Sequence, residues 1–152
     1  MKYILIPLLL FVSITESKTQ VAKFEEIPNN ILSHLDKMGL EEASLLNNYE
    51  QLYFNEIFRK VSGEFNFEGK KIGFLYMGTI SNKKEFFTME KSRFNQNLSP
   101  NQVTLYVFDA NQKEESGGYD GVILYWSKRL LSVKEVVRKI KIKNKLAFIE
   151  FP

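Results

Sequence analysis

The order of hydrophobic and polar positions predicts alternating strands and helices over the second half of the chain. Apolar runs at 70–77 and 103–108 predict two buried strands. A third run at 122–126 follows a polar stretch that contains several glycines. We therefore expect the second and third strands to pair as an antiparallel hairpin.

Two helices are predicted before residue 70. Apolar residues recur at helical spacing within 31–38, and Gly39 marks the end of this helix. A longer helix is predicted over 44–61, with Ser44 as its N-cap. Residues 18–26 show neither period and are expected to be a lead-in without regular structure.

The segment 82–94 allows two interpretations. Its apolar residues fit helical spacing moderately, and Ser81 could cap such a helix, but a strand also fits the pattern.

The end of the chain is also open to two interpretations. The spacing of Ser132 and Glu135 is that of a capping box, which predicts a helix followed by a strand at 146–151. Alternatively, residues 139–143 alternate with period two and could form a hairpin that turns at Asn144.

From residue 70 the predicted order is strand, helix, strand, strand, helix, strand. This is the order of the split βαβ, or ferredoxin-like, motif. We therefore predict a single α+β domain over residues 18–152, in which two N-terminal helices cover a face or an edge of a ferredoxin-like sheet.

The N-terminal residues 1–17 are typical of a secretory signal peptide. Lys2 precedes an apolar run at 3–12, and small polar residues follow up to Ser17. The run is too short to span a bilayer, which needs about 20 apolar residues. We expect export with cleavage after Ser17, giving a secreted or periplasmic protein without a transmembrane segment; the alternative is a buried N-terminal strand.

Cysteine and histidine usage excludes several kinds of chemistry. The chain has no cysteine, so it contains no disulfide, no thiol nucleophile and no Cys-ligated zinc. Its single histidine, His34, cannot form a multi-histidine metal site. No cofactor or metal is therefore expected.

Positive charge is concentrated near the C-terminus. Residues 128–145 contain eight cationic side chains and one carboxylate, so they carry +7, while the chain as a whole carries +3. On a helix, Lys134, Arg138 and Lys141 fall on one stripe. This pattern predicts a basic surface that meets an acidic protein or an anionic envelope component.

The polar segment 109–121 is expected to be a long, solvated turn. Tyr119 is expected to be exposed there and to contact a partner. The carboxylates of Asp109, Glu115 and Asp120 are candidate general acids, since two of them flank the predicted hairpin and a short separation would raise one pKa.

These observations favour a small exported binding or inhibitor module without catalytic activity. Partner contacts are expected at Tyr119, Lys134, Arg138 and Lys141. A monomer is expected, and the glycine-aromatic pattern of RNA-binding strands is missing, so nucleic acid is not an expected partner. The alternative is a hydrolase of envelope or extracellular polymer that uses Asp109, Glu115 and Asp120.

Overall fold

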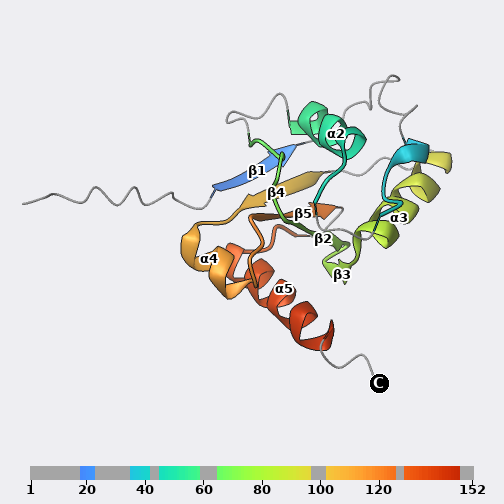
Figure 1. The fold of residues 1–152 in the computed structure, drawn as a ribbon. Helices are drawn as coiled ribbons and strands as arrows, with labels where there is room; N and C mark the ends of the chain where they lie inside the picture. The colour runs from blue at the N-terminus through green and yellow to red at the C-terminus, as the bar shows by residue number, and fades with distance from the viewer. Residues whose placement is uncertain are drawn as a thin grey trace, which may run out of the picture.

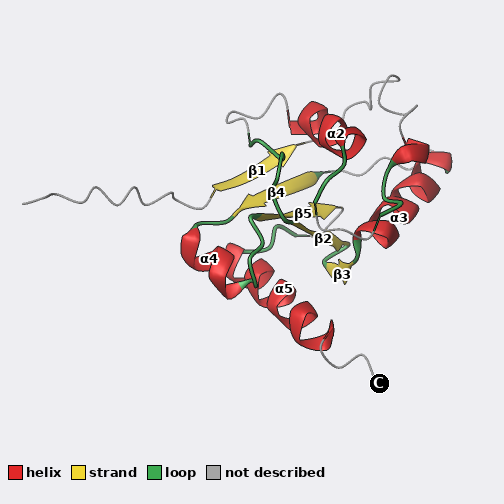
Figure 2. Cartoon of the chain, in the orientation of Figure 1, coloured by secondary structure: helices red, strands yellow, loops and turns green. Residues whose placement is uncertain are grey.

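A computed structural model describes residues 18–22, 35–41, 45–58, 65–96, 102–125 and 129–147. The predicted signal peptide and His34 lie outside these residues. The described part is a single α+β domain with one mixed sheet, in which the strands follow the order β1-β4-β5-β2-β3 (Figures 1 and 2).

The five strands pair in two different ways. In chain order they are β1 Lys18–Ala22, β2 Ile72–Tyr76, β3 Thr79–Ser81, β4 Val103–Val107 and β5 Gly121–Tyr125. The predicted antiparallel pairing of β4 with β5 is confirmed. β2 pairs with β5 in parallel, and β1 and β3 form the antiparallel edges of the sheet.

In the described part of the chain, five helical segments surround this sheet. They are η1 Leu35–Lys37, α2 Asn48–Phe58, α3 Lys83–Asn95, α4 Ala110–Glu115 and α5 Val133–Ala147. Figure 1 shows α2 and α3 on one side of the sheet, with α4 and α5 on the other side.

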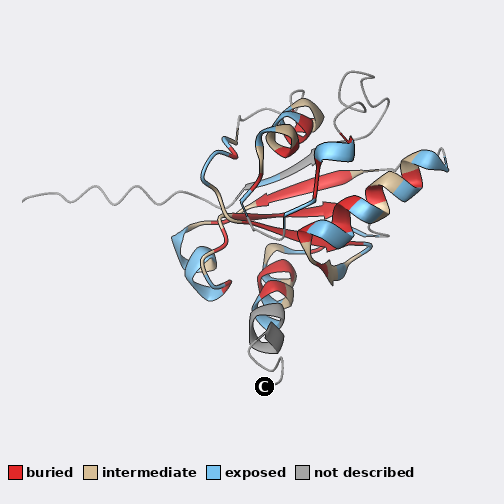
Figure 3. Ribbon diagram, turned by 45° about the vertical axis from the view of Figure 1, so that its right-hand side comes forward, coloured by how far each residue is buried: buried red, intermediate tan, exposed pale blue. Residues whose placement is uncertain are grey.

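Both faces of the central strands are buried, because alternate side chains enter two separate apolar clusters (Figure 3). Phe74 of β2 packs with Phe54 of α2 and with Phe86 of α3. Leu75, the next residue, belongs to the opposite cluster together with Ile140 of α5. The domain therefore has three layers, with helices on each face of the sheet.

The ferredoxin-like prediction is wrong in its topology. A split βαβ motif needs parallel strands on either side of its first helix, whereas β2 and β4, which flank α3, run in opposite directions. The reversal comes from β3, which turns back from β2 through Met77 and Gly78. Both turn residues have positive φ, of 52° and 78°, as the type I′ turn of a two-residue hairpin requires.

The N-terminal predictions also need correction. Residues 18–22 form β1 instead of an unstructured lead-in. Of the first predicted helix, the described part holds only the short 3₁₀ turn η1. The second predicted helix is α2, whose cap is Asn47: its side chain accepts from the Glu50 N–H at 2.9 Å.

Two ambiguous segments prove to be helices. α3 confirms the helical interpretation of 82–94, although its N-cap is Asn82 and not Ser81. The capping box is confirmed, since the Glu135 N–H donates to Ser132 Oγ and the Ser132 N–H donates to Glu135 Oε2. The predicted hairpin at Asn144 is wrong, because α5 continues to Ala147. The predicted strand 146–151 is wrong at its start for the same reason, and residues 148–151 lie outside the described part.

Candidate functional site

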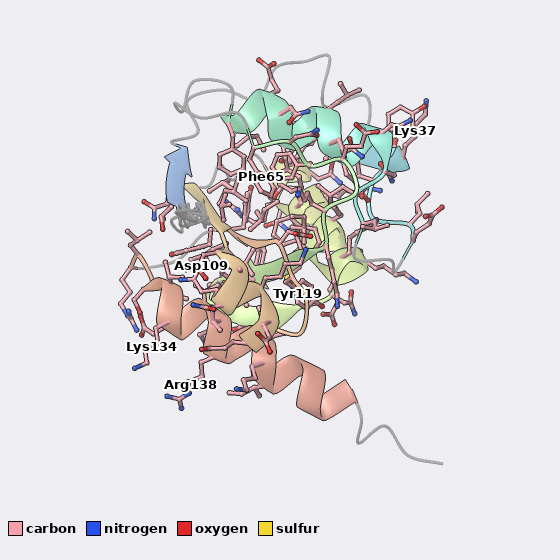
Figure 4. The ribbon with its side chains drawn as sticks, turned by 60° about the vertical axis from the view of Figure 1, so that its left-hand side comes forward. Lys37, Phe65, Asp109, Tyr119, Lys134 and Arg138 are labelled. Atoms are coloured by element: carbon pink, nitrogen blue, oxygen red, sulfur yellow. The ribbon has the colours of Figure 1, made fainter. Side chains whose placement is uncertain are left out.

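The outer face of α5 carries the basic stripe that the sequence predicts. Lys134, Arg138 and Lys141 are exposed, and they are spaced by four and three residues, which places them on one side of a helix. Val136 and Ile140, which point away from this stripe, are completely buried against the sheet. Figure 4 shows Lys134 and Arg138 projecting outward from this helix.

The only carboxylate of the 128–145 segment is already engaged at the start of α5. Arg129 donates two hydrogen bonds to Glu135, at 3.1 and 2.6 Å. These bonds, followed by those from Ser132, lower the pKa of Glu135 to about 2. Glu135 is therefore ionised and paired with Arg129, and within the described residues no carboxylate forms an ion pair with the stripe.

The segment 109–121 differs from the predicted solvated turn because it contains α4. Asp109 is the N-cap of this helix, and its carboxylate accepts from the Gln112 N–H at 2.8 Å. The Gln112 side chain in turn accepts from the Asp109 N–H at 3.0 Å. The carboxylate of Asp109 thus satisfies one of the free backbone donors at the start of α4.

Asp120 anchors the other end of this segment to the sheet. Its carboxylate accepts from Lys113 Nζ at 2.6 Å and from the Lys71 N–H at 2.9 Å. Partial burial acts to raise the pKa of Asp120, but these two donors outweigh it and hold the pKa below its ordinary value. Glu115, at the end of α4, is exposed.

Tyr119 is buried, so the expectation of an exposed ring is wrong. Only 7% of the residue is accessible, and the ring belongs to the α5 side of the core. Lys71 Nζ lies 4.3 Å from the ring centroid, and burial raises the pKa of the phenol. In Figure 4, Tyr119 lies well away from Lys134 and Arg138.

A second polar cluster, which the sequence interpretation missed, is buried on the opposite face. Glu90 of α3 is 2% exposed, and its Oε1 accepts from the hydroxyls of Tyr53 and Tyr125, both at 2.8 Å. Its Oε2 has no hydrogen-bond partner among the described residues. Arg93, also of α3, lies with its guanidinium 4.8 Å from the Tyr125 ring centroid.

Burial is the main cause of the raised pKa of Glu90, and the two tyrosines and Arg93 oppose it. The sequence does carry a signal for this cluster. Glu90 and Arg93 follow Phe86 and Phe87 at intervals of three and four residues, so they occupy positions of the apolar stripe of α3. Charged residues at such positions indicate a buried polar contact.

The described residues contain neither a candidate metal site nor a candidate membrane-spanning helix. No group of three or more carboxylate, histidine or cysteine side chains there could hold a metal ion. Within the same residues, no helix is both long enough and apolar enough to cross a membrane.

The fold therefore defines a three-layer α+β domain with a mixed sheet and a basic outer helix. Residues 42–142, more than half of the chain, match the model of a domain of unknown function, DUF8192, and the chain belongs to this family. No curated protein and no solved structure matches the chain.

Proposed function

We propose that this chain is an exported, non-catalytic binding module that docks on an acidic protein through the outer face of α5. The supporting observation is the exposed row of Lys134, Arg138 and Lys141, which no carboxylate of the described residues neutralises. Arranged charge of one sign increases the rate of association with a partner of the opposite sign and disfavours other partners.

A protein is a better candidate than a lipid surface for this contact. The residues of α5 that face the core are valine and isoleucine, and they are already buried against the sheet. The described face of the helix that points outward presents no aromatic ring. Helices that lie in a membrane interface enter it with several large apolar side chains. Among the described side chains of α5, only one large apolar residue, Ile142, is exposed, so the charge of this face favours a protein partner.

The alternative, a polymer hydrolase that uses Asp109, Glu115 and Asp120, gains no support from their surroundings. Asp109 caps a helix, and Asp120 has two strong donors. The lowered pKa of Asp120 is opposite to the raised pKa that a general acid needs at neutral pH.

The experiment is an affinity capture from an envelope and secreted extract with three forms of the protein. The first is the wild type, the second carries Arg138→Glu and Lys141→Glu, and the third carries Lys84→Glu and Lys91→Glu. The third form has the same net charge as the second, but its changes lie on α3, on the other side of the sheet.

We expect one acidic protein to be captured by the wild type and by the α3 variant and to be lost with the α5 variant. The complex should dissociate in about 1 M salt, where the screening length is about 3 Å. Equal capture by all three forms, or a complex that survives this salt concentration, would contradict charge-led docking. Equal loss of capture with both variants would show that only net charge matters. Binding of the wild type to anionic lipid vesicles in the absence of a partner protein would favour a lipid partner.

A further inference from the structure

The outer face of α5 presents more than the three cations of the basic stripe. Ile142 lies four residues after Arg138 and directly after Lys141, and it is 42% exposed. At about 100° per residue, the three cations and Ile142 fall within an arc of about 100° around the helix axis. Toward the C-terminus of α5, the stripe therefore ends in a large apolar side chain on the same face.

A second exposed apolar side chain lies at the other end of the stripe. Leu130 is 51% exposed, and it follows Arg129, which donates two hydrogen bonds to Glu135 in the first turn of α5. The Leu131 carbonyl accepts from the Tyr106 hydroxyl at 2.7 Å. These bonds hold the segment that carries Leu130 beside the start of the helix, so the cations lie between two exposed apolar residues.

This surface is held in place by the rest of the fold. The capping box of Ser132 and Glu135 fixes the first turn of α5, and Val136 and Ile140 are completely buried beneath it. A surface that is already ordered loses little conformational entropy when a partner binds. Its side-chain spacing therefore restricts which partner segments fit.

The spacing of the cations matches that of carboxylates on a second helix. Along the axis of α5, Arg138 lies about 6 Å from Lys134, and Lys141 lies about 4.5 Å further on. A helix that lies along α5 repeats its side chains at the same intervals, and such rows of side chains pack into one another where two helices meet. On one face of an extended strand, three successive side chains span about 13 Å, whereas the three cations span about 10.5 Å.

We propose that the acidic partner contacts this surface with an amphipathic α-helix, whose carboxylates recur at intervals of three and four residues with a large apolar residue at each end of the row. This inference rests on the proposed function and adds the kind of element that docks. The carboxylates face the basic stripe, and the apolar side chains cover Leu130 and Ile142. The charges increase the rate of association, and the apolar contacts slow dissociation.

The test uses two labelled synthetic peptides of identical composition in a background of alanine and glutamine, which favours a helix. In the matched peptide, three glutamates stand at intervals of four and three residues, with a leucine on the same face at each end of the row. In the shuffled peptide, the same residues are distributed around the helix. Circular dichroism checks that the two peptides are equally helical, and fluorescence anisotropy at low salt measures their binding.

Four forms of the protein are compared. They are the wild type, the form with Arg138→Glu and Lys141→Glu, Ile142→Ser, and the control Leu52→Ser. Leu52 is also exposed, at 56%, but it lies on α2, on the other side of the sheet.

We expect the wild type to bind the matched peptide at least tenfold more tightly than the shuffled one. Ile142→Ser should weaken this binding at least threefold, Leu52→Ser should leave it unchanged, and the charge-reversed form should lose it. Equal binding of both peptides by the wild type, an Ile142→Ser variant that binds like the wild type, or no binding of the matched peptide at all would each overturn the helical partner. The proposed function is decided separately by the affinity capture, in which loss of the acidic protein with the α5 variant supports charge-led docking whatever the shape of the partner.

Discussion

Glu90 lies between α3 and the sheet, where tyrosines and one arginine surround an almost fully buried carboxyl group. The groups that face it are Tyr53 of α2, Tyr125 of β5 and Arg93 of its own helix. Burial raises its pKa in the folded state above the ordinary value of 4.5. The folded protein therefore binds this proton more tightly than the unfolded chain does.

This difference predicts how stability depends on pH. The contribution of Glu90 is fully present below the unfolded pKa and is lost as the pH rises through the folded pKa, with a slope of at most about 1.4 kcal/mol per pH unit. We expect the free energy of unfolding of the wild type to fall relative to that of Glu90→Gln as the pH rises above 4.5. Urea unfolding at several pH values measures this difference, and parallel curves for the two proteins would contradict the prediction.

Glu50 and Lys83 form a buried ion pair that joins α2 to the start of α3. Lys83 Nζ lies 2.8 Å from Glu50 Oε2, and both side chains are almost inaccessible. Glu50 also accepts from the Gly39 and Asn47 N–H groups, and Lys83 donates to the Leu45 carbonyl. This pair fixes the loop before α2 against α3.

Removal of one partner of this pair leaves the other charge buried and alone. We expect Lys83→Ala to lower the free energy of unfolding by about 3–5 kcal/mol. The exposed neighbour Lys84→Ala should change it by about 0.5 kcal/mol or less. Adding Glu50→Gln to Lys83→Ala should restore part of the lost unfolding free energy. If the double variant instead loses as much as Glu50→Gln and Lys83→Ala together, the pairing is contradicted.

At the scale of elements, α4 depends on a cap more than on an apolar face. None of its six residues is buried, so packing contributes little to it. We expect Asp109→Ala to cost about 1 kcal/mol of unfolding free energy and Asp109→Asn to cost much less, because an amide oxygen also caps a helix. Chemical unfolding measures these differences, and Glu115→Ala is the control, which should have little effect. If Asp109→Asn is as unstable as Asp109→Ala, charge and not capping matters at this position.

The pattern of apolar residues identified some elements better than others. The long strands are continuous apolar runs, α3 has apolar residues at approximately helical spacing, and α5 begins with a capping box. α4 has no apolar stripe, and β3 has three residues, too few to show a period. Local patterns reveal elements that bury a face and miss those held by caps and turns.

At the scale of the molecule, the signal-like N-terminus makes a prediction about processing. If export cleaves the chain after Ser17, the mature protein begins with Lys18, which is the first residue of β1. Mass spectrometry of the N-terminal peptide from periplasmic or secreted protein should show Lys18 as the first residue. Intact Met1 on protein purified from the cytoplasm would contradict both the cleavage and the proposed export.

The amino-acid sequence by itself determined the α+β class, the pairing of β4 with β5, the cap of α5 and the basic stripe formed by Lys134, Arg138 and Lys141. Each depends on residues close together in the chain or on a simple period. Only the tertiary structure decided that helices cover both faces of the sheet, that β1 completes its edge, and that Tyr119 is buried and Glu90 lies among tyrosines. These features depend on contacts between distant segments, and a local pattern shows that a residue is apolar or charged but not which distant residues surround it.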